Sequence, residues 1–298
     1  MPYFSDDSDH FDAMATILGV FSHAGIKPVP PSAWQYINRL LRYVFRRNLD
    51  LNQLPHLSAK QLGRKLFQPQ TKQDLLELLL VLPYVKGTYC PKTASRLEDY
   101  FDSLGVLTNE LKKTRQLVAV HLQVARYQQL RVMPQLLTSV PIETENQRLM
   151  ERYQCLKKLD SASLGKGLYN LYEQAEWPFP GSAHGPSSGL VVIGDLSTVL
   201  LGLAPNIKRA LLLSAFQSGY AKNHSIAIAA SALIDFVSPL RRKQKEAEIS
   251  IKSMLHCNDY GKAQEIGQRM SYSLYDGWNY WNDARLSIEN VREKYGIA

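Results

Sequence analysis

The sequence predicts an all-α protein, a helical bundle with two helical subdomains. Three observations lead to this fold class. Apolar residues recur every three or four positions along most of the chain. Residues that begin or end helices, such as Ser32, Pro91 and Gly105, stand at the edges of these periodic segments. No segment shows the sustained alternation of β-branched residues that is typical of a strand.

The composition is that of an ordinary globular protein. The 298 residues are 45% hydrophobic and 21% charged, with a net charge of +8. The three cysteines, Cys90, Cys155 and Cys257, form no CxxC motif. The beginning, "MPYFSDDSDHFD", is acidic where a secretory signal would be basic and then apolar. We therefore expect a cytoplasmic protein without a membrane-spanning segment.

In the first half the periodic segments predict six helices. One runs from Asp7 to before Gly25, and a second follows Ser32. A short third helix covers residues 58–67. The residues 71–74, "TKQD", predict the start of a fourth, because an acid follows a threonine cap by three positions. A fifth lies between Pro91 and Gly105, and a long sixth covers 110–133.

The polar segment 138–147 is the best linker candidate, so we expect domains at 1–140 and 141–298. The second domain is expected to contain helices over 145–159, 205–221, 223–237 and 239–256. Residues 159–189 end in a stretch rich in Gly, Pro and Ser, which indicates a long loop. An aromatic turn and a short helix end the chain.

A row of arginines is the main electrostatic feature. Arg39, Arg42, Arg46 and Arg47 fall on one side of the second predicted helix. The row is either a solvated helix face or a docking surface for an anionic membrane or an acidic protein. No nucleic-acid-binding motif surrounds it, so nucleic acid is not an expected partner.

The run "LVVIGDLSTVLLGL" places one carboxylate, Asp195, among apolar residues. Asp195 is either the N-cap of a helix over 196–203 or part of a site. As a site residue it would act as a general acid or base. His184 and His224, which flank this region in the sequence, are the other candidates for such chemistry.

The segment "SLGKGLYNLY", followed by this run, by "LLSAFQSGY" and by the ending "GWNYW…LSIENVREKYGI", resembles the coenzyme Q (ubiquinone) biosynthesis protein 4 family. The resemblance covers about residues 155–298. It implies an all-helical domain that binds an isoprenoid lipid and acts at a peripheral membrane site, here the inner membrane face. The family's Ser/Thr-Leu-Gly-x-x-Tyr segment falls on Ser163, Leu164, Gly165 and, one position displaced, Tyr169.

The family's metal signature is His-Asp-x-x-His, followed after eleven residues by Glu. In this sequence it falls on Gly194, Asp195, Thr198 and Ala210, so only the aspartate is kept. One carboxylate and one hydroxyl are a poor ligand set for a transition metal. We therefore expect no metal and no cofactor.

The first half has a fainter resemblance to TerB-like helical domains, carried by "LLELLLVLPYVKGTYCPKTASRLEDYFDSLGV". Such domains usually have an acidic turn that can bind a cation. Here the turn keeps Gly87 but has Lys86 in place of the acid, which argues against metal binding in this half.

Together these observations favour a pseudoenzyme, a non-metal member of the coenzyme Q family. It would bind an isoprenoid or quinone-type lipid, or scaffold a biosynthetic complex. The expected ligand-binding residues are Leu164, Tyr169, Asp195 and Thr198. The alternatives are an enzyme that uses Asp195 and a histidine on a lipid or aromatic substrate, and a basic helical interaction module.

Overall fold

The computed structural model describes residues 7–22, 31–47, 49–66, 68–85, 90–130, 146–186, 189–205, 207–221, 225–235 and 257–297. Within these ranges all regular elements are helices, and the β pairing is limited to an isolated bridge between Ser163 and Ser287. The predicted all-α class is therefore confirmed. None of the described helices is long and apolar enough to cross a membrane.

The chain divides into two compact units, each built from two stretches of sequence. The first unit is Met1–Leu122 with His224–Gly261, and the second is Gln123–Asn223 with Lys262–Ala298. Two of the three divisions fall within helices, α6 (Thr108–Leu130) and α13 (Cys257–Arg269), and the third lies outside the described residues. The predicted boundary at residue 140 lies outside the described residues.

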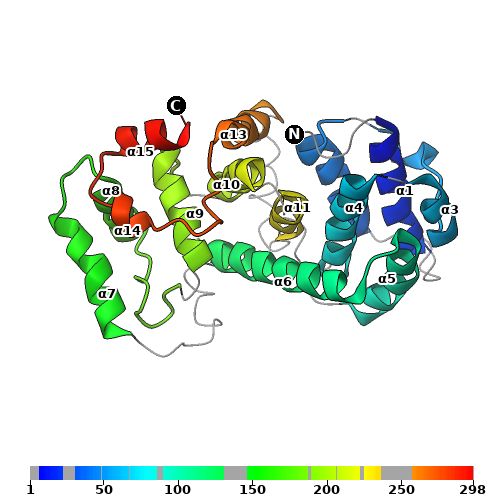
Figure 1. Ribbon diagram of the computed structural model, residues 1–298, viewed down its shortest axis with the longest axis horizontal. Coiled ribbons are helices and arrows are strands. Elements are labelled where there is room, and N and C mark those ends of the chain that lie inside the picture. Colours follow the sequence, from blue (N-terminus) through cyan, green and yellow to red (C-terminus); the bar gives the residue numbers. More distant parts are fainter. Residues whose placement is uncertain are drawn as a thin grey trace. The chain divides into compact units, whose positions relative to one another are not determined.

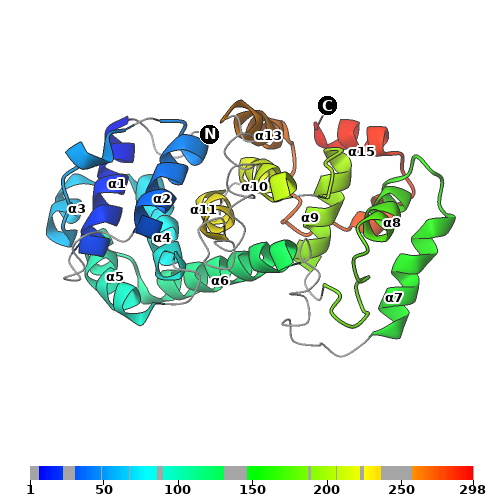
Figure 2. The same cartoon turned by 180° about the vertical axis from the view of Figure 1, so that it is seen from behind.

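The first unit is a group of helices that surround α4 (Figures 1 and 2). Its elements, besides the start of α6, are α1 (Asp7–Ser22), α2 (Pro31–Arg39), the π-helix η1 (Leu40–Val44), the 3₁₀ turns η2 (Leu51–Gln53) and η3 (Leu82–Tyr84), α3 (Ala59–Lys65), α4 (Pro69–Val81), α5 (Pro91–Leu104) and α11 (Ser225–Asp235). Residues 75–81 of α4 are apolar except for Glu77 and are all buried, because the helix packs against α1, α5 and α11.

Local sequence signals set several helix ends in this unit. Ser58 and Gln61 form a capping box at the start of α3. Pro91 occupies the first turn of α5, and Gly105 ends that helix in the left-handed conformation with φ of 66°. The predicted cap at Thr71 is wrong, because α4 begins at Pro69 and places Thr71 inside the helix.

A buried acid joins two segments that are distant in the sequence. Glu77 of α4 is 2% exposed, and its Oε2 accepts a hydrogen bond of 3.0 Å from the backbone N–H of Ala227 in the first turn of α11. The N-terminal N–H groups of a helix have no partner within the helix, and they favour negative charge. Glu77 therefore fixes the start of α11 from the neighbouring helix.

The second unit contains the Asp195 region. Its elements, besides the ends of α6 and α13, are α7 (Gln147–Gln154), the 3₁₀ turn η5 (Cys155–Lys158), α8 (Leu164–Gln174), α9 (Gly189–Leu200), α10 (Ile207–Tyr220), α14 (Tyr280–Asp283) and α15 (Ile288–Tyr295). Helix α9 packs against α8, α10 and α15. Helices α14 and α15 both contact α8, and all three are labelled in Figure 1.

Two serine caps hold the start of α8 beside the start of α15. Ser163 caps α8 and Ser287 caps α15, each accepting a backbone N–H within the first turn. The N–H of Leu164 donates to the carbonyl of Leu286 at 2.9 Å, and that of Ile288 donates to Ala162 at 2.9 Å. Helix α8, within the segment expected to end in a long loop, and α13 were not predicted. The expected helix over 239–256 lies outside the described residues.

Asp283 ties the end of the chain together. This carboxylate is 2% exposed and accepts hydrogen bonds from the indole of Trp278 at 2.8 Å, from Tyr295 at 2.7 Å and from Lys294 at 2.7 Å. Burial opposes ionisation of Asp283, but these three donors outweigh it and hold the pKa of the carboxyl below its ordinary value of 3.8.

The Asp283 network predicts a pH-dependent stability. A carboxyl whose pKa is depressed by folding stabilises the protein above its unfolded-state pKa, and this contribution is lost as the pH falls through the folded-state pKa. We expect Asp283→Asn to lower the free energy of unfolding by about 1–3 kcal/mol at pH 7. The difference from wild type should shrink below about pH 4. Urea unfolding of both proteins at pH 7 and pH 3 measures this, and an equal difference at both pH values would contradict it.

Candidate functional site

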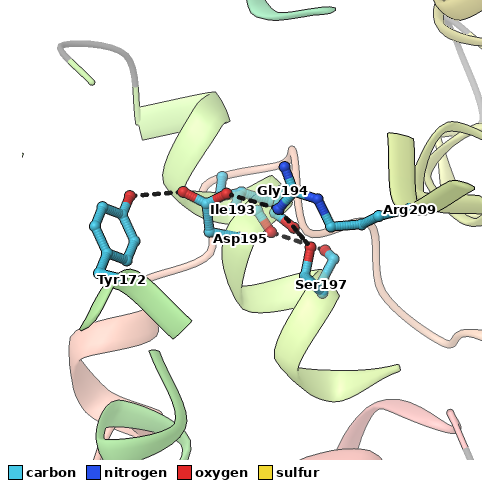
Figure 3. Close-up of polar contacts among 7 residues, drawn as sticks. Tyr172, Ile193, Gly194, Asp195, Ser197 and Arg209 are labelled. Atoms are coloured by element: carbon cyan, nitrogen blue, oxygen red, sulfur yellow. Dashed lines mark hydrogen bonds and ion pairs between the residues drawn. The ribbon is translucent and has the colours of Figure 1, made fainter. Parts of the chain in front are cut away.

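Asp195 lies in the middle of α9, and its side chain lies between Tyr172 and Arg209 (Figure 3). The helix begins six residues earlier, at Gly189, so the interpretation of Asp195 as an N-cap is wrong. The side chain is fully buried, with 0% exposure. A buried carboxylate needs charge and hydrogen-bond partners, since burial without them is costly.

Arg209 of α10 supplies a positive charge to this carboxylate. Its Nη1 lies 3.4 Å from Asp195 Oδ1 and 3.3 Å from Thr198 Oγ1. The arginine is as buried as its partner, with 1% exposure. Thr198 also donates a hydrogen bond to the carbonyl of Gly194 at 2.9 Å, which orients its hydroxyl oxygen. Two of the predicted binding residues, Asp195 and Thr198, therefore contact the same guanidinium.

An aromatic cluster closes the site on the side of α8. The hydroxyl of Tyr172 donates to Asp195 Oδ2 at 2.6 Å, so each carboxylate oxygen has a partner (Figure 3). The ring of Trp177 lies under the guanidinium, with 4.4 Å between Arg209 Cζ and the ring centroid. Tyr172 stacks on Phe179 at 5.2 Å and meets Trp177 edge to face at 6.1 Å.

A pair of tyrosines, Tyr153 and Tyr280, lies near this cluster, and their hydroxyls are hydrogen-bonded to each other. Burial raises the pKa of Tyr153 far above its ordinary value, and the neighbouring Tyr280 and Asp195 raise the pKa further. The hydroxyl of Tyr153 therefore stays protonated at physiological pH.

The other two predicted ligand-binding residues belong to α8. Leu164 is completely buried and serves packing at the start of the helix. Tyr169 is half-buried; its ring lies 5.5 Å from Phe179 and 4.9 Å from Lys166 Nζ. Tyr169 thus offers an aromatic face near the surface, one turn from Tyr172.

The predicted histidines have different outcomes. His184 lies in a turn with φ of 58°, and its backbone carbonyl accepts a hydrogen bond of 2.7 Å from the hydroxyl of Tyr127. Asp195 contacts the side chains of Tyr172 and Arg209, and not that of His184 as the acid–base hypothesis expected. His224 lies outside the described residues.

The four predicted arginines do not share one helix: Arg39 ends α2, Arg42 lies in η1, and Arg46 and Arg47 follow η1. Arg46 has a left-handed backbone with φ of 54°, so the helical spacing ends before it. Arg42, Arg46 and Arg47 are exposed, and Arg39 is half-buried. Arg46 has an internal contact, because its Nη2 donates to the carbonyl of Gly261 at 2.8 Å. The guanidinium of Arg42 lies 5.7 Å from the ring centroid of Tyr43.

Side-chain packing shows what the metal-signature positions can hold. Among the described residues, no three His, Cys, Asp or Glu side chains gather where they could bind a metal ion. A Cβ atom at Gly194 would lie 2.3 Å from Gln128 Nε2 and 3.3 Å from Gln217 Nε2. A histidine at position 194 would therefore require at least the Gln128 amide to move. The TerB-like turn with Lys86 and Gly87 is not among the described residues.

Sequence reasoning missed Arg209, Tyr172 and Trp177. One signal could have found Arg209: a buried carboxylate requires a cation, and Arg209 directly precedes Ala210, the position of the family's glutamate. No comparable signal marks Tyr172 or Trp177, because aromatic residues at helical spacing are typical of any core. Comparison with protein-family models finds no match to this sequence, and comparison with curated proteins finds none either.

Proposed function

We propose that this chain is a non-catalytic, lipid-binding relative of the coenzyme Q biosynthesis protein 4 family. The observation that carries the proposal is the buried pair of Asp195 and Arg209. The Arg209 guanidinium lies beside the carboxylate that the resemblance assigns to the metal signature. Gln128 and Gln217 fill the space beside Gly194. This arrangement favours a structural role for Asp195 over acid–base chemistry.

The choice of an isoprenoid or quinone-type lipid rests on the resemblance over residues 155–298 and on aromatic surface near the site. Tyr169 and Phe179 are both half-buried, so solvent reaches part of each ring. Flat aromatic surface of this kind stacks well against a conjugated ring. Attachment at a peripheral membrane site, with the arginine row as one contact, belongs to the same proposal.

Native mass spectrometry of the full chain purified from cells tests lipid binding directly. We expect a bound isoprenoid or quinone, and saturable quenching of tryptophan fluorescence by a long-chain quinone. Tyr169→Ala should weaken this binding, since it removes the half-buried ring. Tyr272→Ala is the matched control, because Tyr272 is 37% exposed on the segment between α13 and α14. Repeated absence of both bound lipid and fluorescence quenching would contradict lipid binding. Scaffolding of a biosynthetic complex would then be the function to test.

A further inference from the structure

We propose that Tyr172, Trp177, Asp195 and Thr198 form a binding site for a planar guanidinium cation, with the chain's own Arg209 as its ligand. We call these four residues the guanidinium box. The inference is independent of lipid binding, because it concerns only the contacts of Arg209. According to this proposal, the second unit needs a guanidinium cation, and not merely a positive charge, between α8, α9 and α10.

The four residues supply complementary chemistry around a single group. Asp195 and Thr198 place one carboxylate oxygen and one hydroxyl oxygen at 3.4 and 3.3 Å from the same nitrogen, Nη1. The Trp177 ring lies 4.4 Å from the central carbon of the guanidinium. Tyr172 holds the other carboxylate oxygen at 2.6 Å and so fixes the orientation of Asp195.

This combination is suited to guanidinium more than to other cations. A guanidinium is planar and weakly hydrated, so it stacks on an indole face while its edge donates hydrogen bonds to oxygen atoms. An ammonium is strongly hydrated and has no flat face. Burial also favours guanidinium, because a weakly hydrated cation loses less when it leaves water. The exposed fractions of Arg209, Asp195 and Thr198 are 1%, 0% and 1%.

The walls of the box are held by contacts that do not involve Arg209. The backbone N–H of Trp177 donates to the backbone carbonyl of Tyr172 at 2.9 Å. Tyr172 stacks on Phe179 at 5.2 Å, and Thr198 donates to Gly194 at 2.9 Å. Truncation of Arg209 should therefore leave a preformed space that a soluble guanidinium ion can enter.

Chemical rescue of the full-length Arg209→Ala variant tests the proposal. The variant should have a lower Tm than wild type, and low millimolar guanidinium chloride should restore part of the loss, because a ligand that binds only the folded state stabilises it. Urea, a neutral molecule of similar shape, and potassium chloride should give no recovery. Wild type should show no gain in any of the three. If guanidinium chloride lowers the Tm of Arg209→Ala as much as it lowers that of wild type, the proposal is overturned.

Two further variants keep the test decisive. Adding Trp177→Leu to Arg209→Ala should abolish the rescue, and rescue that persists without the indole would contradict the assignment of Trp177. Arg209→Gln keeps hydrogen-bond donors and much of the volume but removes the charge. It should also lower the Tm, and a value equal to wild type would show that the box does not require a cation. This variant decides the question if Arg209→Ala fails to fold.

Discussion

Replacing Arg209 by methionine is expected to lower the free energy of unfolding by roughly 3–5 kcal/mol. Methionine preserves apolar volume but leaves the Asp195 carboxylate without the cation that lies 3.4 Å away. Loss of one partner of a buried ion pair is severe, because the remaining charge has been removed from water without compensation. Chemical denaturation of the full chain at neutral pH measures the effect.

The double variant Asp195→Leu, Arg209→Met tests whether the loss of stability comes from the unpaired charge. When both charges of a buried pair are replaced by apolar residues, the desolvation cost disappears with them, and stability is often recovered. We therefore expect the double variant to be more stable than Arg209→Met alone. Arg285→Met is the control, since this arginine of the same unit is exposed and should change stability by no more than about 0.5 kcal/mol. Additive losses in the double variant would contradict a direct charge pair.

Replacing Gly267 by alanine is expected to destabilise the protein by at least about 2 kcal/mol. Gly267 of α13 and Gly219 of α10 meet back to back, and a Cβ at position 267 would lie 2.1 Å from the carbonyl oxygen of Phe216. Alanine gains about 1 kcal/mol of helix propensity over glycine. A backbone carbonyl cannot rotate away as a side chain can, so the two helices must separate and the packing loss exceeds that gain.

Gly189→Ala is the matched control for this helix crossing. Gly189 is the first residue of α9, and a Cβ there would meet no atom of the neighbouring described segments within 4 Å. Its replacement should change the unfolding free energy by no more than about 0.5 kcal/mol. Thermal and urea unfolding of both variants compare the two glycines, and similar small effects would show that α10 and α13 do not need this close approach.

Features of the sequence that act locally predicted part of the fold well. Pro91 and Gly105 set the ends of α5, because proline is suited to a first helical turn and glycine to the left-handed residue after the last. Thr71 shows where local signals fail. Its hydroxyl donates to Asp9 at 3.3 Å, a contact across 62 positions that no capping rule contains.

Helix α8 was missed for a related reason. Gly165 and Gly167 lower its intrinsic helix propensity, and the sequence around them suggests a loop. The structure uses Gly165 for close packing, since a Cβ there would lie 2.9 Å from the carbonyl oxygen of Ala284. The residue that weakens the helix locally thus allows it to pack against a segment more than one hundred residues away.

The sequence by itself determined the all-α class, several helix ends and the presence of a lone acid in an apolar run. These properties depend on periodicity and on contacts within one helical turn, which can be read along the chain. Only the tertiary structure decided what that acid does. Asp195 is joined to Tyr172 and to Arg209, which lie 23 positions before it and 14 positions after it. A buried charge is defined by the partners that surround it, and helix packing is what brings them together.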